Sequence, residues 1–251
     1  MIYDVAGINM SPVKKALVAG RLNKRVKHFG LASYGEYFKY LTRDVDGEFQ
    51  VAVDMLTTNE TFFFREQKHF DFLRQRVLAQ RRGGSLRLWS AASSSGEEAY
   101  SLAMEVSEHA PTSAWEIVGT DISTRVLAVA RSGQYPIARA EDIPERYLKK
   151  YCLKGIGAHE GTFIVDPKLK ARVSFVHANL KENLSKLGMF DVVFLRNVMI
   201  YFDLVTKRQV VAGIIRQLKP GGFLMVGHSE SLNGITEAIR LVAPSIYQNP
   251  V

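Results

Sequence analysis

An α/β fold is predicted for this chain: a parallel sheet wound by helices and preceded by a small all-α region. From residue 86 onward, short apolar runs typical of strands alternate with segments of helical periodicity, which is typical of right-handed β-α-β crossovers. Before residue 76, apolar residues recur at helical spacing only. We therefore expect a helical domain at residues 1–75 and an α/β domain at residues 76–251.

The expected N-terminal helices have ordinary start and stop signals. Pro12 suits the beginning of a helix and Gly30 its end, which predicts a helix over residues 13–29. Two further helices are expected over residues 34–43 and 66–82, where apolar residues follow the helical period.

The α/β part is expected to contain five strands and three long helices. The strands are predicted at residues 86–91, 115–119, 173–176, 190–195 and 223–227. The helices are predicted at residues 97–109, 124–132 and 204–218. The turn Lys219-Pro220-Gly221-Gly222 is expected to close the last helix.

The stretch at about 134–172 departs from this rhythm. A short apolar run at residues 162–165 reads as a strand, so we expect an insertion with its own small sheet. The alternative is a long irregular connection, which is uncommon in compact domains.

Composition limits the class of protein. Cys152 is the only cysteine among 251 residues, so an internal disulfide is excluded and a reducing, cytoplasmic location is expected. No apolar run approaches the ~18 residues of a membrane span, and the first residues lack the regions of a signal peptide. Membrane insertion is therefore not expected. The six histidines show no metal-ligand spacing, and no metal is predicted.

The net charge of +8 is concentrated near the N-terminus. Against Asp4 alone, the first 30 residues contain six cations: Lys14, Lys15, Arg21, Lys24, Arg25 and Lys27. A basic excess favours an acidic partner. Nucleic acid, an anionic membrane surface and an acidic protein all stay open on charge alone.

The loop after the first expected strand indicates the kind of ligand. Small residues at 91–96 lead into a helix, and Ser95 and Glu98 are spaced as a capping box. The G-x-G-x-x-G fingerprint is absent, and Glu97 and Glu98 would repel a phosphate. A cationic ligand such as S-adenosylmethionine suits the two carboxylates better, and an ordinary capped loop is the alternative.

Polar residues also follow the next three expected strands. Asp121 stands where an acid commonly holds ribose hydroxyls, although it could simply cap the next helix. Asn179 could read an adenine edge, and Arg196 with Asn197 would face the group to be modified. Because ligands bind at the carboxyl ends of parallel strands, these positions together predict one site.

The segment at residues 57–66 adds polar residues to three consecutive phenylalanines. Asn59, Thr61 and Arg65 alternate with the aromatic residues and could face a cleft. The phenylalanines themselves are expected to pack in a core.

With these features together, the chain resembles the CheR family of chemoreceptor glutamate methyltransferases over essentially its whole length. The resemblance rests on seven motifs in order: TTNETFFFRE (57–66), WSAASSSGEEAYS (89–101), GTDIS (119–123), ARSGQY (130–135), RNVMIYFD (196–203), LKPGG (218–222) and GHSES (227–231). It implies a Rossmann-like S-adenosylmethionine methyltransferase domain with a small β-subdomain insertion, preceded by an all-α domain. It also implies a bacterial protein-glutamate O-methyltransferase that acts in chemotactic adaptation, with S-adenosylhomocysteine as product.

The resemblance also implies site residues. The implied cofactor-contacting residues are Asn59, Thr61, Arg65, Glu97, Asp121, Asn179, Leu180, Arg196 and Asn197. Tyr201 and an arginine near Arg81 match positions implicated in the reaction, and no short motif fixes the register of the arginine.

The implied partner is the cytoplasmic helical bundle of a chemoreceptor. Four cations of the basic helix would dock on its acidic surface: Lys14, Arg21, Lys24 and Arg25. A solvated basic face is the alternative. In some family members only, the β-subdomain also binds a receptor tail.

Three other functions are alternatives on the sequence alone. A methyltransferase for nucleic acid or a small molecule is disfavoured because Arg196-Asn197-Val198-Met199 replaces the Asn/Asp-Pro-Pro-aromatic motif of amino-methylating enzymes. A nicotinamide dehydrogenase is disfavoured by the missing glycines. A non-catalytic module that binds the cofactor is compatible with every motif.

Overall fold

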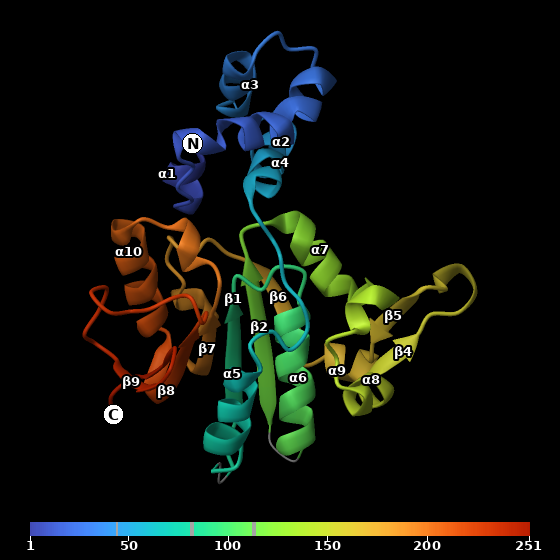
Figure 1. Cartoon of the computed structure of the whole chain (residues 1–251), viewed down its shortest axis with the longest axis vertical. Helices are drawn as coiled ribbons and strands as arrows, with labels where there is room; N and C mark the ends of the chain where they lie inside the picture. The colour runs from blue at the N-terminus through green and yellow to red at the C-terminus, as the bar shows by residue number, and fades with distance from the viewer. Residues whose placement is uncertain (44, 81–82, 112–113) are drawn as a thin grey trace.

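The computed structural model describes residues 1–43, 45–80, 83–111 and 114–251. Its first part is helical: α1 (Ile2–Ala6), α2 (Lys15–His28), α3 (Tyr34–Leu41) and α4 (Glu48–Leu56) stand at one end of the molecule (Figure 1). The turns η1 (Pro12–Lys14) and η2 (Val45–Gly47) lie between them. Leu22, Val26, Tyr37, Leu41 and Ala52 are among the buried residues of this helical core.

Within the described ranges, seven strands form one sheet in the order β6-β2-β1-β7-β8-β10-β9. The first five are parallel: β1 (Leu86–Ala91), β2 (Trp115–Asp121), β6 (Val173–His177), β7 (Phe190–Leu195) and β8 (Leu218–Val226). The last two, β9 (Arg240–Ala243) and β10 (Ile246–Gln248), form antiparallel pairs. Strand order reverses between β1 and β7, so the switch point of the sheet lies there.

Helices cover both faces of this sheet. They are α5 (Gln67–Phe72) with the π-helical turn η3 (Leu73–Leu78), α6 (Glu97–His109), α7 (Thr124–Ser132) and α10 (Leu204–Ile215) (Figure 1). One core contains Phe70 and Leu73 together with Leu88 and Leu102, and a second contains Trp89 and Val210. The α/β fold expected from the alternation of strands and helices is therefore confirmed.

The expected insertion is present and has its own sheet. Its three antiparallel strands have the order β3-β5-β4: β3 (Gln134–Pro136), β4 (Cys152–Lys154) and β5 (Thr162–Val165). The helices η4 (Ile137–Ala140), α8 (Glu145–Tyr151), η5 (Gly157–His159) and α9 (Pro167–Lys170) complete it. This subdomain projects sideways from the main sheet beside α6 and α7 (Figure 1).

Several elements differ from the prediction. Residues 219–222 belong to β8 rather than to a closed turn, but they interrupt its pairing, because Leu218 pairs with Phe190 and Phe223 already pairs with Val192. Helix α10 accordingly ends at Ile215. The strands β9 and β10 were not predicted, since each has only three or four residues. The short turns η6 (Ser185–Leu187) and η7 (Met199–Tyr201) were not predicted either.

Side-chain contacts of the helical part fix its junction with the sheet. Asp54 of α4 accepts hydrogen bonds from the backbone nitrogens of Thr124 and Arg125, at 2.9 and 3.1 Å, and so binds the first turn of α7. Arg21 donates to the carbonyl oxygens of Leu56 and Thr57, at 2.8 and 3.1 Å. The segment that leads from α4 to the sheet is thus held at its start.

The domain boundary expected near residue 75 remains a prediction. Helix α5 contributes Phe70 and Leu73 to the core of the sheet, whereas the helical core ends with Leu56 of α4. This packing favours a boundary close to residue 57. Among the described residues, no helix is long and apolar enough to cross a membrane.

Candidate functional site

A pocket of about 880 Å³, partly open to solvent, lies at the carboxyl ends of the parallel strands, where the helical part meets the sheet. Its lining includes eight of the nine predicted cofactor residues: Asn59, Thr61, Arg65, Asp121, Asn179, Leu180, Arg196 and Asn197. Tyr201, predicted to take part in the reaction, also lines it. Arg81, the other predicted reaction residue, lies outside the described residues.

One wall of the pocket, which we call the backbone wall, follows β1 and β2. Ala92 and Ser94 line it with left-handed backbone angles, φ 63° and 49°. The Ser94 nitrogen donates to Asp121 Oδ2 at 2.9 Å, and its hydroxyl donates to the Asn59 carbonyl at 2.8 Å. A tight loop of small residues thus brings its backbone against the pocket without the usual glycines.

The capping box expected in this loop is wrong. Helix α6 begins after Gly96, which has a φ of 97° and makes no side-chain cap. Glu98 instead accepts a hydrogen bond from Ser90, and Ser95 donates to Glu97. Spacing alone indicated a cap, but these carboxylates point to other partners.

Asp121 closes the backbone wall. Burial raises the pKa of its carboxyl group, and hydrogen bonds from the backbone nitrogens of Ser123 and Ser94 offset part of this shift. Oδ1 accepts from Ser123 at 2.9 Å. The carboxylate therefore organises the loops after β1 and β2 while it faces the pocket.

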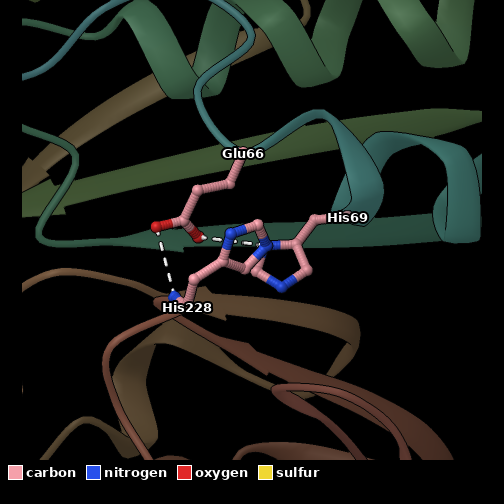
Figure 2. Close-up of side chains that lie close together, drawn as sticks. All are labelled: Glu66, His69 and His228. Carbon is pink, nitrogen blue, oxygen red and sulfur yellow. Dashed lines mark hydrogen bonds and ion pairs between the residues drawn. The ribbon is translucent and has the colours of Figure 1, made fainter.

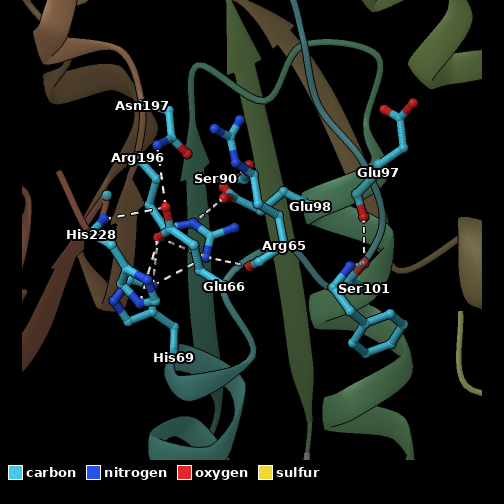
Figure 3. A network of polar contacts seen from close by, with 12 residues as sticks. Arg65, Glu66, His69, Ser90, Glu97, Glu98, Ser101, Arg196, Asn197 and His228 are labelled. Carbon is cyan, nitrogen blue, oxygen red and sulfur yellow. Dashed lines mark hydrogen bonds and ion pairs between the residues drawn. The ribbon is translucent and has the colours of Figure 1, made fainter. Parts of the chain in front are cut away.

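Glu97 is the predicted cofactor residue that does not line the pocket. It is buried, and Figure 3 shows it pointing away from Glu98 and Arg196. Arg139 of the β-subdomain lies 3.3 Å from Glu97 Oε1 and also donates to the Thr61 carbonyl at 2.6 Å. Burial raises the pKa of Glu97. These contacts link the β-subdomain to the pocket rim, and a cofactor contact by Glu97 stays a prediction.

The opposite wall follows β7 and the loop after it, and we call it the ionic wall. Arg196 at its centre is buried, and its Nε donates to Glu98 Oε2 at 2.7 Å, while Nη1 donates to the Arg65 carbonyl at 2.7 Å. Ser90 donates to the other oxygen of Glu98 at 2.6 Å. Figure 3 shows the ion pair beside the strands (Figure 3). Because both partners are buried, their charges depend on each other.

Behind Arg196 lies a cluster that sequence reasoning missed: Glu66, His69 and His228 (Figure 2). Arg196 Nη1 lies 3.1 Å from His69 Nδ1, and His69 Nε2 lies 2.8 Å from Ser245 Oγ. Since a guanidinium can only donate, His69 is assigned the neutral tautomer with its proton on Nε2. Burial, together with the Arg196 charge, lowers the pKa of His69 to about 3.

Glu66 in this cluster stays ionised. Burial acts to raise its pKa, but the Arg196 charge and the hydrogen bond from the His228 nitrogen outweigh it, and the pKa lies below its ordinary value. Oε1 accepts from Asn197 Nδ2 and from the His228 nitrogen, each at 3.2 Å. The carboxylate therefore places a second negative charge beside Arg196, in addition to that of Glu98.

These three side chains could in principle hold a metal, since their ligand atoms lie within 4.8 Å of one another. Arg196 opposes this use, because Nη1 already donates to His69 Nδ1 and lies 3.6 Å from Glu66 Oε2. A divalent cation there would face a buried guanidinium at close range. The donor set fits a hydrogen-bonded network better than a metal centre. The histidines lie 159 positions apart in sequence, so ligand spacing gave no sign of the cluster.

The N-terminal segment closes the third side of the pocket. Ala6 and Ile8 line it, and between them Gly7 passes so close to α10 that a Cβ would lie 2.4 Å from Thr206. Asn179 donates to the Val5 carbonyl at 2.8 Å, and the Asn9 nitrogen donates to the Tyr201 carbonyl at 2.8 Å. The amide nitrogen of Asn179, predicted to read adenine, is therefore already engaged by α1.

The basic helix α2 divides its cations between two uses. Arg21 holds the segment after α4, and Arg25 forms an ion pair with buried Glu48. The side chains of Lys24 and Lys27 are exposed on the outer face. Lys14, in η1 just before this helix, has its Nζ 5.9 Å from the centre of the Tyr201 ring. Two of the four predicted docking cations are thus committed to internal contacts.

Comparison with known proteins places this geometry in a family. "CheR methyltransferase, SAM binding domain" matches residues 59–247, and "CheR methyltransferase, all-alpha domain" matches residues 1–57. "Chemotaxis protein methyltransferase" of Escherichia coli (strain K12) is 38% identical over 251 residues, 98% of this chain and 87% of that protein. "Chemotaxis protein methyltransferase 2" of Pseudomonas aeruginosa (strain PAO1) is 39% identical over 250 residues, 98% and 89% of the respective chains.

Proposed function

This chain belongs to the CheR methyltransferase family and carries out S-adenosylmethionine-dependent methylation in chemotaxis, and we propose that its acceptors are glutamate side chains of chemoreceptors. The observation that carries the proposal is the shared pocket. Tyr201 and Asn197 line the same cavity as the strand-end residues Asp121 and Asn179. One cavity can therefore hold a cofactor and admit an acceptor.

The pocket fits the cofactor chemically. It is concave, partly open to solvent, and lined by both polar and apolar side chains, as small-molecule sites are. Asp121 and Asn179 supply polar groups for a nucleoside, and Ala92 and Ser94 leave room for it. Glu98 also lines the pocket, where its carboxylate is paired with Arg196. When bound, S-adenosylmethionine supplies an activated methyl group on a sulfonium sulfur.

The residues of the chain then have a limited task. A glutamate acceptor is ionised at neutral pH, so no general base is needed to remove a proton. Alignment of the reactants and exclusion of water provide most of the acceleration. We assign the orientation of the acceptor carboxylate to Tyr201, which lines the pocket. A hydroxyl group is suited to this role because a tight ion pair would stabilise the nucleophile before reaction.

We propose that the receptor bundle docks on the exposed face of α2. Because Arg21 and Arg25 are engaged internally, Lys24 and Lys27 are the cations offered to an acidic helical surface. A receptor tail at the β-subdomain is a further proposal. The contacts of Arg139 with Thr61 and Glu97 would connect that subdomain to the pocket.

The test of the acceptor is transfer of a labelled methyl group to receptor cytoplasmic fragments of the source organism. Release of the label from protein by mild base is expected, because a carboxyl methyl ester is base-labile. Base-stable label, or label on nucleic acid, would point to another acceptor. Binding of S-adenosylhomocysteine without any transfer would favour a non-catalytic module.

The docking face is tested separately with Lys24→Glu. We expect slower transfer and unchanged affinity for S-adenosylhomocysteine, because rim charges act mainly on association. Lys186→Glu is the matched control, since Lys186 is exposed near the start of β7, at the opposite end of the strands. Equal rates for both variants would contradict docking at this face.

A further inference from the structure

Glu230 lies in the loop after β8 and has no part in the function described so far. It does not line the pocket, yet its carboxylate is largely enclosed by the loops around it. Oε2 accepts hydrogen bonds from the backbone nitrogens of Asn197, at 2.8 Å, and Gly227, at 2.7 Å. Oε1 accepts from the nitrogen of Ile200 at 3.3 Å. One side chain therefore joins the loops after β7 and β8.

One residue that Glu230 binds, Asn197, has a left-handed backbone. Its φ is 57°, in a region that residues other than glycine adopt infrequently, although Asn does so more readily than most. Glu230 binds its backbone nitrogen, and Glu66 accepts from its side-chain amide at 3.2 Å. Figure 3 shows the second of these contacts (Figure 3). Two carboxylates thus fix Asn197 from outside the pocket.

Gly227 leaves the space that this arrangement needs. A Cβ at this position would lie 2.7 Å from Glu230 Oε2, 2.7 Å from Asn197 Nδ2 and 3.0 Å from the Asn197 nitrogen. Its φ lies outside the left-handed region, so alanine is allowed by the backbone and is opposed by these contacts alone.

The contacts of Glu230 extend to the reaction end of the pocket. Ile200 lies within the single turn η7, which carries Tyr201, and the Tyr201 nitrogen donates to the Val198 carbonyl at 3.2 Å. A carboxylate that accepts from Asn197 and Ile200 therefore holds the first residue of this pocket-lining segment and the residue before Tyr201. Asn197, Val198 and Tyr201 all line the pocket.

We propose that Glu230 is a positioning residue for methyl transfer, which holds Asn197 and Tyr201 in their orientation toward the pocket through three backbone hydrogen bonds. The proposal rests on the proposed function of that pocket. One consequence of the proposal can be measured by ligand binding alone, without methyl transfer. Displacement of Asn197 would change the part of the pocket that binds the cofactor.

The first experiment compares Glu230→Ala and Glu230→Gln with the full-length wild-type chain. Calorimetry with S-adenosylhomocysteine gives the affinity and the fraction of molecules able to bind, and labelled-methyl transfer gives the rate per binding molecule. We expect the rate of Glu230→Ala to fall about 100-fold, the effect of a misplacement of about 1 Å. Glu230→Gln should regain part of it, since one amide oxygen can still accept from Asn197 and Gly227. Glu237→Gln, an exposed residue of the same connection, is the control.

The second experiment uses Gly227→Ala, which leaves the carboxylate in place but crowds it. It should lower affinity and rate in the same direction as Glu230→Ala, and the double variant should be no worse than the more impaired single one. An unchanged affinity together with an unchanged rate per binding molecule in Glu230→Ala overturns the proposal. Independent, additive losses in the double variant also overturn it. A wild type that binds S-adenosylhomocysteine but transfers no methyl group contradicts the proposed function instead, and the affinity comparison still tests Glu230.

Discussion

The two walls of the pocket are built on opposite sides of the switch point between β1 and β7, and they differ in what holds them. The backbone wall contains two small residues in left-handed conformations, Ala92 and Ser94, and the Ser94 nitrogen donates to Asp121. The ionic wall contains Arg196 and Asn197, held by charged side chains from distant elements, including Glu98 and Glu66.

This difference indicates that the two walls have different roles in the site. A wall of backbone donors and small residues changes little in shape when a ligand arrives, which suits a cofactor of constant structure. A wall of coupled charges keeps its shape only while every partner is present. Substitutions in the ionic wall should therefore lower the unfolding free energy. Substitutions in the backbone wall should mainly lower the affinity for the cofactor.

The largest effect is expected for Glu98→Leu in the ionic wall. The change leaves the buried guanidinium of Arg196 without its nearest carboxylate, and such a loss costs about 3–5 kcal/mol of unfolding free energy. Urea unfolding measures it. Glu116→Gln breaks a partly exposed ion pair with Arg87 and should cost less than about 1 kcal/mol. Similar costs for the two variants would show that the buried pair of the ionic wall stabilises the fold no more than a partly exposed pair.

The fold was predictable where local patterns decide it. Helices α6 and α7 and strands β1 and β7 have their predicted bounds, because each is an unbroken periodic segment between strong turn signals. Strands β9 and β10 escaped prediction because they are too short to show alternation and exist by pairing with β8.

The next effect concerns pH and His69. The pKa of this buried histidine falls from its ordinary 6.5 to about 3 in the folded chain. Between these values the unfolded state binds more protons, so the unfolding free energy decreases as pH falls from about 6.5 toward 3. The slope attributable to one such group is up to about 1.4 kcal/mol per pH unit.

His69→Gln should remove this part of the slope. Unfolding is measured between pH 5 and 6.5 for both proteins, and the difference of slopes is the informative quantity. Glu66 and Asp203, whose pKa values are lowered, also weaken both proteins as pH falls, which is why the wild-type slope alone is insufficient. Parallel slopes would show that His69 takes up a proton equally in both states.

The site was predictable where strand ends converge. Asp121, Asn179 and Arg196 meet because parallel strands place their carboxyl ends at one edge of the sheet. Spacing could not distinguish Glu97 from Glu98, because the direction of each side chain depends on distant partners, Arg139 and Arg196. The supporting carboxylates could not be found either, since Glu66 and Glu230 lie 131 and 33 positions from Asn197.

The smallest effect is expected in the backbone wall, for Asp121→Asn. Because burial raises the pKa of Asp121, the folded chain already bears the cost of enclosing its charge, and the amide avoids that cost. This gain is offset by the loss of one backbone hydrogen bond, since Ser94 and Ser123 donate to different carboxylate oxygens and an amide has only one. Unfolding free energy should therefore change little. Affinity for S-adenosylhomocysteine should fall about tenfold, or about 1.4 kcal/mol, because hydrogen bonds to a charged acceptor are lost. Asp142→Asn, at an exposed aspartate, should change neither quantity in calorimetry and urea unfolding. Asp121→Asn could instead destabilise the chain as much as Glu98→Leu does, without weakening ligand binding. Asp121 would then be a structural charge like those of the ionic wall, and the cofactor would have to be held by the ionic wall.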